Sequence, residues 1–162
     1  MKKTISVLVE NRAGVLSRIA GLFSRRGFNI DSLAVGVTDD RTVSRMTIVA
    51  ECDDYLSEQM EKQLNKLIDV IKVRSADSDE LISRETMLIK VAATNTLRGE
   101  IIDVVKIMGA KIVDISKSTL TIEICDSPDR VDLLEELMRP YKIKELVRTG
   151  TIALQKGGDS AF

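Results

Sequence analysis

The sequence predicts an α+β protein made of two tandem βαββαβ units. Two observations support this prediction. Strand-like runs of alternating, β-branched residues are interspersed with runs whose apolar residues recur at helical spacing. The second half of the chain also repeats the apolar positions of the first half at an offset of 82 residues. The 162 residues leave about seventy-five per unit, so each unit is a small domain that would be only marginally stable on its own.

The first unit begins with an alternating run over residues 4–9, which predicts a strand. After a polar turn, apolar residues recur at helical spacing and Gly27 supplies a stop, which predicts a helix over residues 15–26. Residues 30–37 and 46–51 are apolar, β-rich runs separated by a polar stretch. This pattern is typical of a hairpin.

A second helix and a strand complete the first unit. Asp53 and Asp54 suit the positive N-terminal end of this helix, and residues 70–73 form the closing strand. The buried stripe of the helix is predicted to be Leu56, Met60, Leu64 and Leu67.

The second unit repeats this order. Ile19 and Gly27 recur as Ile101 and Gly109. The hairpin of the second unit is tighter, with strands over residues 112–115 and 120–125. Its second helix is predicted to open with Ser127 as cap and Pro128 at the first position, and to continue through Val131, Leu134, Leu137 and Met138. Residues 144–147 and 151–154 are the predicted closing strands.

These patterns divide the chain into three parts. We expect a first domain over residues 1–76, a polar and acidic linker over residues 77–84, and a second domain over residues 85–162. A βαββαβ unit places both helices on one face of its sheet and leaves strand edges unpaired. We therefore expect the units to pair side by side into a homodimer.

Composition excludes several classes of function. Lys plus Arg number 24 and Asp plus Glu 25, a net charge of −1 that does not suit a general nucleic-acid binder. Aromatic residues make up 3%, so stacking platforms for bases are scarce. The chain has no histidine, which removes imidazole bases and the common zinc sites, and we expect neither a catalytic residue nor a metal site.

Location and thiol chemistry follow from the same composition. The sequence has no apolar run long enough for a membrane helix and no secretory signal, so we expect a cytoplasmic protein without a membrane partner. Cys52 and Cys125 each end an apolar run, which predicts two buried, inert thiols.

The internal repeat separates scaffold residues from candidate site residues. At the same offset, Asn11 is matched by Ala93, and Asn29 is matched by Lys111. Gly14 is matched by Thr96. If the fold alone required the two asparagines and the glycine, the second unit would carry similar residues. A role as turn residues and a role in binding both remain open.

A helix that starts at Val15 directs free N–H groups and a partial positive charge toward the preceding loop, which suits a carboxylate. Gly14 lets a ligand approach the backbone closely. The amides of Asn11 and Asn29 offer both donors and acceptors. These residue types favour the binding of a small amino acid without any reaction.

The same residues carry a resemblance to a known family. Residues 11–16, 18–23, 26–30 and 32–33 resemble the ACT-domain signature of the acetolactate synthase (acetohydroxyacid synthase) small subunit. Leu88–Val91 and Ile143–Gly150 resemble the C-terminal domain of the same family. The resemblance implies two ferredoxin-like βαββαβ domains, an N-terminal ACT domain and a C-terminal domain.

The resemblance also implies a function. Members of this family are non-catalytic regulatory subunits in branched-chain amino-acid (valine, leucine, isoleucine) biosynthesis. They bind the large catalytic subunit, raise its activity and transmit feedback inhibition by valine. Thiamine diphosphate, magnesium and FAD would then belong to the catalytic partner, with no cofactor on this chain.

The family's effector site corresponds to five positions of this sequence, and valine would lie between two ACT domains across the dimer. The sequence departs from the family pattern near its end, where Lys142 stands in place of a usual glycine. The matched positions are Asn11, Gly14, Val15, Asn29 and Ile30.

Several alternatives stay open. The chain could instead be a stand-alone ACT-type amino-acid sensor that regulates another enzyme or a transcription factor. Leucine or isoleucine could replace valine, because one methylene discriminates by only about 1–3 kcal/mol. Arg148–Gly150 fits either a turn or a surface that activates the large subunit. The arginines around the first helix fit a solvated face or a docking surface.

Overall fold

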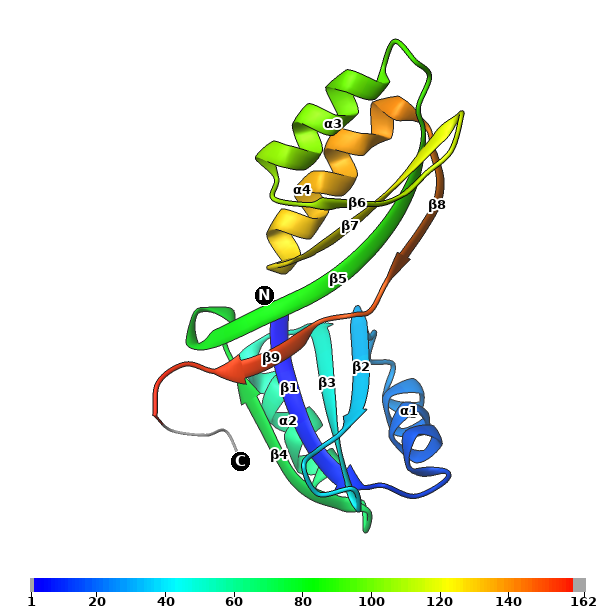
Figure 1. Cartoon of the computed structure of the whole chain (residues 1–162). Helices are drawn as coiled ribbons and strands as arrows, with labels where there is room; N and C mark the ends of the chain where they lie inside the picture. Colours follow the sequence, from blue (N-terminus) through cyan, green and yellow to red (C-terminus); the bar gives the residue numbers. More distant parts are fainter. Residues whose placement is uncertain (1, 159–162) are drawn as a thin grey trace. The chain divides into compact units, whose positions relative to one another are not determined.

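A computed structural model describes residues 2–158 and divides the chain into two compact units (Figure 1). Among these residues, one unit contains residues 2–82 together with residues 151–158, and the other is Ser83–Gly150. In each unit two helices cover one face of an antiparallel sheet (Figure 1). The predicted α+β class and the βαββαβ order are confirmed.

The first unit has a four-stranded sheet in the order β2-β3-β1-β4, which makes β2 an edge strand. Ile5 of β1 lies opposite Ile48 of β3, and Ile48 lies opposite Leu33 of β2. The elements are β1 (Lys2–Glu10), α1 (Val15–Arg26), β2 (Ser32–Val37), β3 (Val43–Glu51), α2 (Asp54–Leu64) and β4 (Val70–Ala76).

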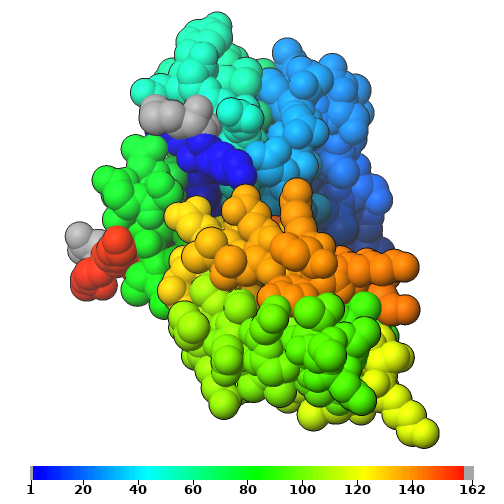
Figure 2. Space-filling view, turned by 90° about the horizontal axis from the view of Figure 1, so that it is seen from above, coloured from blue at the N-terminus to red at the C-terminus, as the bar shows by residue number. Residues whose placement is uncertain are grey.

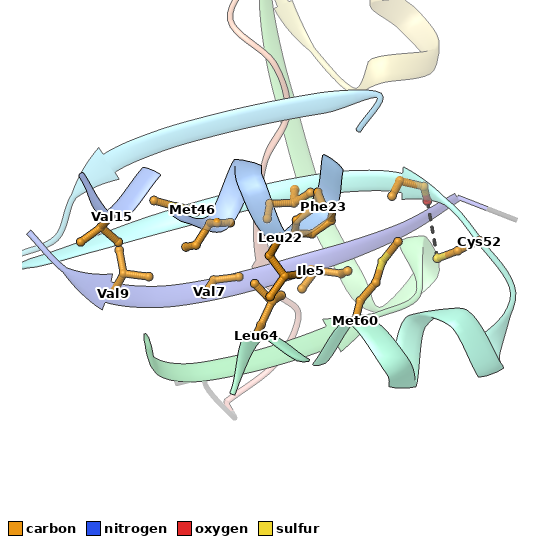
Figure 3. Close-up of a cluster of buried hydrophobic side chains, with 13 residues drawn as sticks. Ile5, Val7, Val9, Val15, Leu22, Phe23, Met46, Cys52, Met60 and Leu64 are labelled. Carbon is orange, nitrogen blue, oxygen red and sulfur yellow. Dashed lines mark hydrogen bonds between the residues drawn. The ribbon is translucent and has the colours of Figure 1, made fainter. Parts of the chain in front are cut away.

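Alternate residues of the central strand β1 form the floor of the first core (Figure 3). Helix α1 covers this floor with one apolar face, and it ends at the left-handed Gly27 as its sequence predicts. The rings of Phe23 and Phe28 pack edge to face, with their centroids 5.9 Å apart. The side chains labelled in Figure 3 are Ile5, Val7, Val9, Val15, Leu22, Phe23, Met46, Cys52, Met60 and Leu64.

The prediction for the two cysteines is half right. Cys52 is buried in the first core, and burial raises the pKa of its thiol. Cys125 is exposed. The reason is register, because Cys125 pairs with Thr86 on the face of the second sheet away from the helices, whereas its neighbour Ile124 points into the core.

The second unit repeats the architecture, with the strand order β6-β7-β5-β8. Helices α3 and α4 form an exposed face of this unit (Figure 2). Leu137 lies at the surface of α4, because it is rotated away from Leu134 on the side opposite Met138. The elements are β5 (Leu81–Ala92), α3 (Arg98–Ile107), β6 (Lys111–Ile115), β7 (Thr119–Asp126), α4 (Pro128–Met138) and β8 (Ile143–Arg148).

The start of α4 differs from the prediction in one detail. Ser127 is the N-cap residue, but among the described residues its hydroxyl accepts no hydrogen bond from the first helical turn. Asp126 supplies the polar contacts instead, because its carboxylate accepts from the Arg130 Nε (2.5 Å) and from the Ser127 amide (2.8 Å). These contacts, the Arg130 bond first, lower the pKa of Asp126.

The boundaries of the compact units differ from the expected domains 1–76 and 85–162. The expected linker, residues 77–84, contains a 3₁₀ turn at Ser78–Glu80 and the first residues of β5. The last strand, β9 (Ile152–Gln155), pairs with β5 and belongs to the first unit. Hydrophobic alternation identifies a strand, but it does not say which sheet the strand joins.

Lys142 adopts the backbone conformation that glycine would adopt more easily. Its φ is 58°, and no other non-glycine residue among residues 2–158 has a positive φ. The Ala92 amide donates to the Lys142 carbonyl oxygen at 3.1 Å, so the turn that leads into β8 is kept. The lysine is accommodated at the cost of backbone strain.

We expect Lys142→Gly to stabilise the second unit by about 1 kcal/mol, because glycine removes the steric cost of positive φ. Chemical denaturation measures this change. Lys144→Gly is the matched control, since Lys144 lies within β8, where glycine weakens a strand. A Lys142→Gly chain no more stable than the wild type would contradict the strain argument.

Candidate functional site

The loop between β1 and α1 ends in a residue that must tolerate a left-handed backbone. Gly14 is the N-cap of α1, with φ 86° and ψ −10°. Its carbonyl oxygen accepts the Arg18 amide at 3.0 Å, which is the first hydrogen bond of the helix. The amides of the helical residues before Arg18 therefore have no acceptor within the helix. The first turn of α1 has no acidic residue and no side-chain cap. The Val15 amide donates to the Arg12 carbonyl oxygen at 3.5 Å, and the positive end of the helix faces this loop without a carboxylate or a side-chain cap.

Asn11 is fixed by the turn between β2 and β3. Its backbone amide donates to the Thr42 carbonyl oxygen at 2.7 Å, and its side-chain Nδ2 donates to the Arg41 carbonyl oxygen at 2.9 Å. Asp40 holds this turn in shape, because its carboxylate accepts from the Thr42 hydroxyl (2.6 Å) and amide (2.8 Å). These bonds lower the pKa of Asp40, the hydroxyl bond first.

An open hollow of about 430 Å³ lies beside Asn11. Val43 and Ile71 give it an apolar wall, and backbone and side-chain polar groups surround them. Arg12, on its rim, is paired with Glu10. Its lining consists of Glu10, Asn11, Arg12, Arg41, Thr42, Val43 and Ile71. A hollow with these groups suits a small amphiphilic molecule.

Asn29 and Ile30 lie just before β2. The Asn29 side chain is exposed, and its Nδ2 donates to Asp31 Oδ1 at 3.1 Å. Ile30 is partly buried against the first core. Asn29 therefore presents an amide to solvent next to an apolar side chain.

The two halves of the predicted site lie at opposite ends of the first sheet (Figure 1). The start of β2, Ser32, lies opposite Val49, which lies opposite Thr4 near the start of β1. Asn11 follows the other end of β1. The separation is close to the length of α1, about 18 Å for twelve residues. One chain therefore does not bring Asn11 and Asn29 together.

Val15 is placed differently from the other four predicted residues. Its side chain is 3% exposed and packs in the first core. Asn11, Gly14 and Asn29 are exposed. The side chain of Val15 therefore belongs to the core, and its amide donates to the Arg12 carbonyl oxygen at 3.5 Å.

Sequence reasoning missed the contribution of the β2–β3 turn. Arg41 and Thr42 line the hollow and hold Asn11, but residues 38–42 were interpreted only as a polar hairpin turn. The Asp40-x-Thr42 spacing was the available signal, since aspartate commonly accepts from the residue two positions later.

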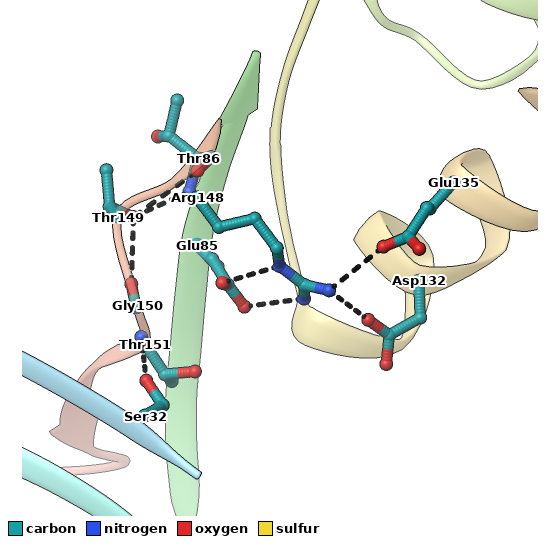
Figure 4. Close-up of polar contacts among 9 residues, drawn as sticks. All are labelled: Ser32, Glu85, Thr86, Asp132, Glu135, Arg148, Thr149, Gly150 and Thr151. Atoms are coloured by element: carbon teal, nitrogen blue, oxygen red, sulfur yellow. Dashed lines mark hydrogen bonds and ion pairs between the residues drawn. The ribbon is translucent and has the colours of Figure 1, made fainter. Parts of the chain in front are cut away.

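The segment Arg148–Gly150 is engaged within the second unit (Figure 4). The Arg148 guanidinium forms a two-bond ion pair with Glu85 at 2.8 and 2.9 Å, and it contacts Asp132 at 2.7 Å. The bond to Glu85 is the main cause that raises the Arg148 pKa above its ordinary value. The Thr149 amide donates to the Thr86 carbonyl oxygen at 3.0 Å. These contacts favour the turn interpretation over a free activating surface.

Two features are absent from the part of the chain that the structure describes. Residues 2–158 contain no group of three His, Cys, Asp or Glu side chains arranged to hold a metal ion. No helix within the same residues is long and apolar enough to span a membrane.

Two family models match the chain. Residues 5–72 match the acetohydroxyacid synthase small subunit-like ACT domain, and residues 84–157 match the small subunit of acetolactate synthase. The two matches cover most of both compact units.

Similar proteins carry the same description. A probable acetolactate synthase small subunit of Archaeoglobus fulgidus is 53% identical over 97% of this chain and 98% of that protein. The acetolactate synthase small subunit of Mycolicibacterium smegmatis is 49% identical over 95% and 91%. The acetolactate synthase small subunit of Thermotoga maritima, known from a crystal structure, is 36% identical in sequence. Its structure superimposes with a TM-score of 0.91, and the match covers 98% of this chain and 99% of that chain.

Proposed function

Because the chain belongs to the acetolactate synthase small-subunit family, we propose that it binds and activates the catalytic large subunit and transmits feedback inhibition by valine. The observation that supports the effector role most strongly is the uncompensated N-terminus of α1, capped by the left-handed Gly14. The chain is then a regulatory rather than a catalytic subunit. Thiamine diphosphate, magnesium and FAD belong to its cytoplasmic partner.

In this proposal the effector site is shared by two copies of the chain. β2 is an edge strand, and its Val35 and Val37 are about half exposed. An edge with exposed valines is a template for another strand. If two copies pair through β2 in antiparallel fashion, the start of one β2 meets the end of the other, and Asn29 of one copy approaches the Asn11–Gly14 loop of its partner.

The shared site matches the three parts of an α-amino acid. The amides at the start of α1 favour the carboxylate. The side-chain oxygens of Asn11 and Asn29 can accept from the ammonium group. Ile30, partly buried next to Asn29, offers an apolar surface to a branched side chain. The site binds its ligand without any group that transforms it.

Calorimetric titration of the full chain with its large subunit tests this proposal. We expect saturable valine binding that is roughly tenfold weaker in Asn29→Ala, which loses hydrogen bonds to a charged ligand. Asn65→Ala is the matched control, because Asn65 is an exposed residue at the end of α2. Equal binding by Asn29→Ala and the control would place the site elsewhere. No binding of valine, leucine or isoleucine would refute the effector role.

The second candidate function is that of a stand-alone amino-acid sensor. It shares the effector site but not the partner, so co-purification of a thiamine-dependent large subunit separates the two functions. The match of residues 84–157 to the small subunit of acetolactate synthase favours the regulatory subunit.

A further inference from the structure

The short segment from Arg148 to Thr151 is fixed at its first residue by charge. Arg148 is surrounded by three carboxylates of the second unit, and the one that makes two bonds to it, Glu85, has a side chain that is 6% exposed (Figure 4). The other two carboxylates are Asp132 (2.7 Å) and Glu135 (3.5 Å). A two-bond ion pair with a buried carboxylate holds the guanidinium in one orientation.

The last residue of the segment is fixed in the first unit. The Thr151 amide donates to the Ser32 hydroxyl oxygen at 2.7 Å (Figure 4). Thr151 is 6% exposed, so water competes poorly for this bond. The chain then continues into β9, where the Ala153 carbonyl oxygen accepts from the Arg45 guanidinium at 3.0 Å.

Ser32 is close in sequence to the proposed effector residues. It is the first residue of β2 and follows Ile30 by two positions. Between them, Asp31 accepts the side chain of Asn29 at 3.1 Å and donates its own amide to the Val49 carbonyl oxygen at 2.9 Å. A ligand ammonium that donates to the Asn29 side-chain oxygen fixes the orientation of this amide, whose Nδ2 bonds Asp31, the residue adjacent to Ser32.

We infer that the hydrogen bond between Ser32 and Thr151 couples effector binding to the second unit. This inference rests on the proposed valine site. Binding at Asn29 shifts the start of β2 and changes the population in which the bond is made. The backbone between Thr151 and Arg148 transmits this change in population to the ion pairs around Arg148. Gly150, with φ 83°, lies within this stretch of backbone.

Ser32→Ala removes the acceptor and leaves the five proposed effector residues in place. Ser32→Thr keeps a hydroxyl and is the conservative rescue. Ser24→Ala is the matched control, because Ser24 is exposed on α1. The full chain is measured in three ways: amide hydrogen exchange over residues 149–155, valine titration by calorimetry, and valine inhibition of the enzyme reconstituted with its large subunit.

We expect Ser32→Ala to exchange its Thr151 amide roughly tenfold faster, as the loss of one hydrogen bond predicts. It should bind valine as the wild type does but lose most of the inhibition, where coupling factors are typically about 5- to 150-fold. Ser24→Ala and Ser32→Thr should keep the inhibition. Full inhibition of Ser32→Ala would overturn the inference, whereas failure of the wild type to bind valine would refute the proposed function on which it rests.

Discussion

Replacing Gly14 by aspartate is expected to abolish the response to valine while the chain still folds and activates the large subunit. The new carboxylate would stand where the amides of α1 are proposed to receive the carboxylate of the ligand. Two like charges about 4 Å apart near a protein surface repel by about 4 kcal/mol. Valine binding should therefore weaken roughly a hundredfold or more.

Two controls separate charge from strain in this experiment. Gly14→Ala introduces the same unfavourable backbone without the charge, and a Cβ at this position has room, with Arg18 Nη1 the nearest atom at 3.6 Å. Gly99→Asp adds the same charge to the first turn of α3. Valine titration and activation of the large subunit are measured for all three. Loss of activation in Gly14→Asp alone would contradict a site confined to effector binding.

Replacing Arg148 by leucine is expected to destabilise the second unit by about 3 kcal/mol. The substitution leaves Glu85, whose side chain is 6% exposed, as a buried carboxylate without its two-bond partner. Arg148 itself is 27% exposed, so the expected loss lies at the lower end of the range for buried ion pairs.

Chemical denaturation followed by a probe in the second unit measures this loss. The double variant Arg148→Leu with Glu85→Leu should recover much of the stability, because no unpaired charge is left. Arg139→Leu is the matched control, since Arg139 is 68% exposed and its pair with Glu135 should contribute little. Similar losses for Arg148→Leu and Arg139→Leu would show that Glu85 does not depend on Arg148.

Local structure was predictable where residues such as glycine mark the ends of a helix in the sequence. The helix over residues 15–26 is found with those bounds, because a run of helical periodicity is enclosed by Gly14 and Gly27, which both adopt positive φ. The strand predicted over residues 151–154 is found as β9 (Ile152–Gln155), which pairs with β5 but lies in the compact unit that contains the N-terminal residues. Its alternation is compatible with either sheet, and its partner is chosen by tertiary packing.

The sequence singles out candidate site residues but does not give their geometry. Asn11, Gly14 and Asn29 stood out because the second unit lacks them at the same offset. That Asn11 and Asn29 lie at opposite ends of one sheet follows from strand order and register, which the sequence does not state. The burial of Val15 agrees with the helical spacing, which puts this residue on the apolar face of the helix over residues 15–26.

The central claim is that two copies of the chain share each valine site, and mixed dimers test it most directly. Asn11→Ala and Asn29→Ala chains are each titrated with valine alone and then after mixing and re-assembly. In a shared site, about half of the dimers in an equal mixture are mixed, and each mixed dimer regains one intact site. We predict that strong valine binding returns only on mixing. If the mixture binds as weakly as its two components, the site lies within one chain and the shared-site proposal is wrong.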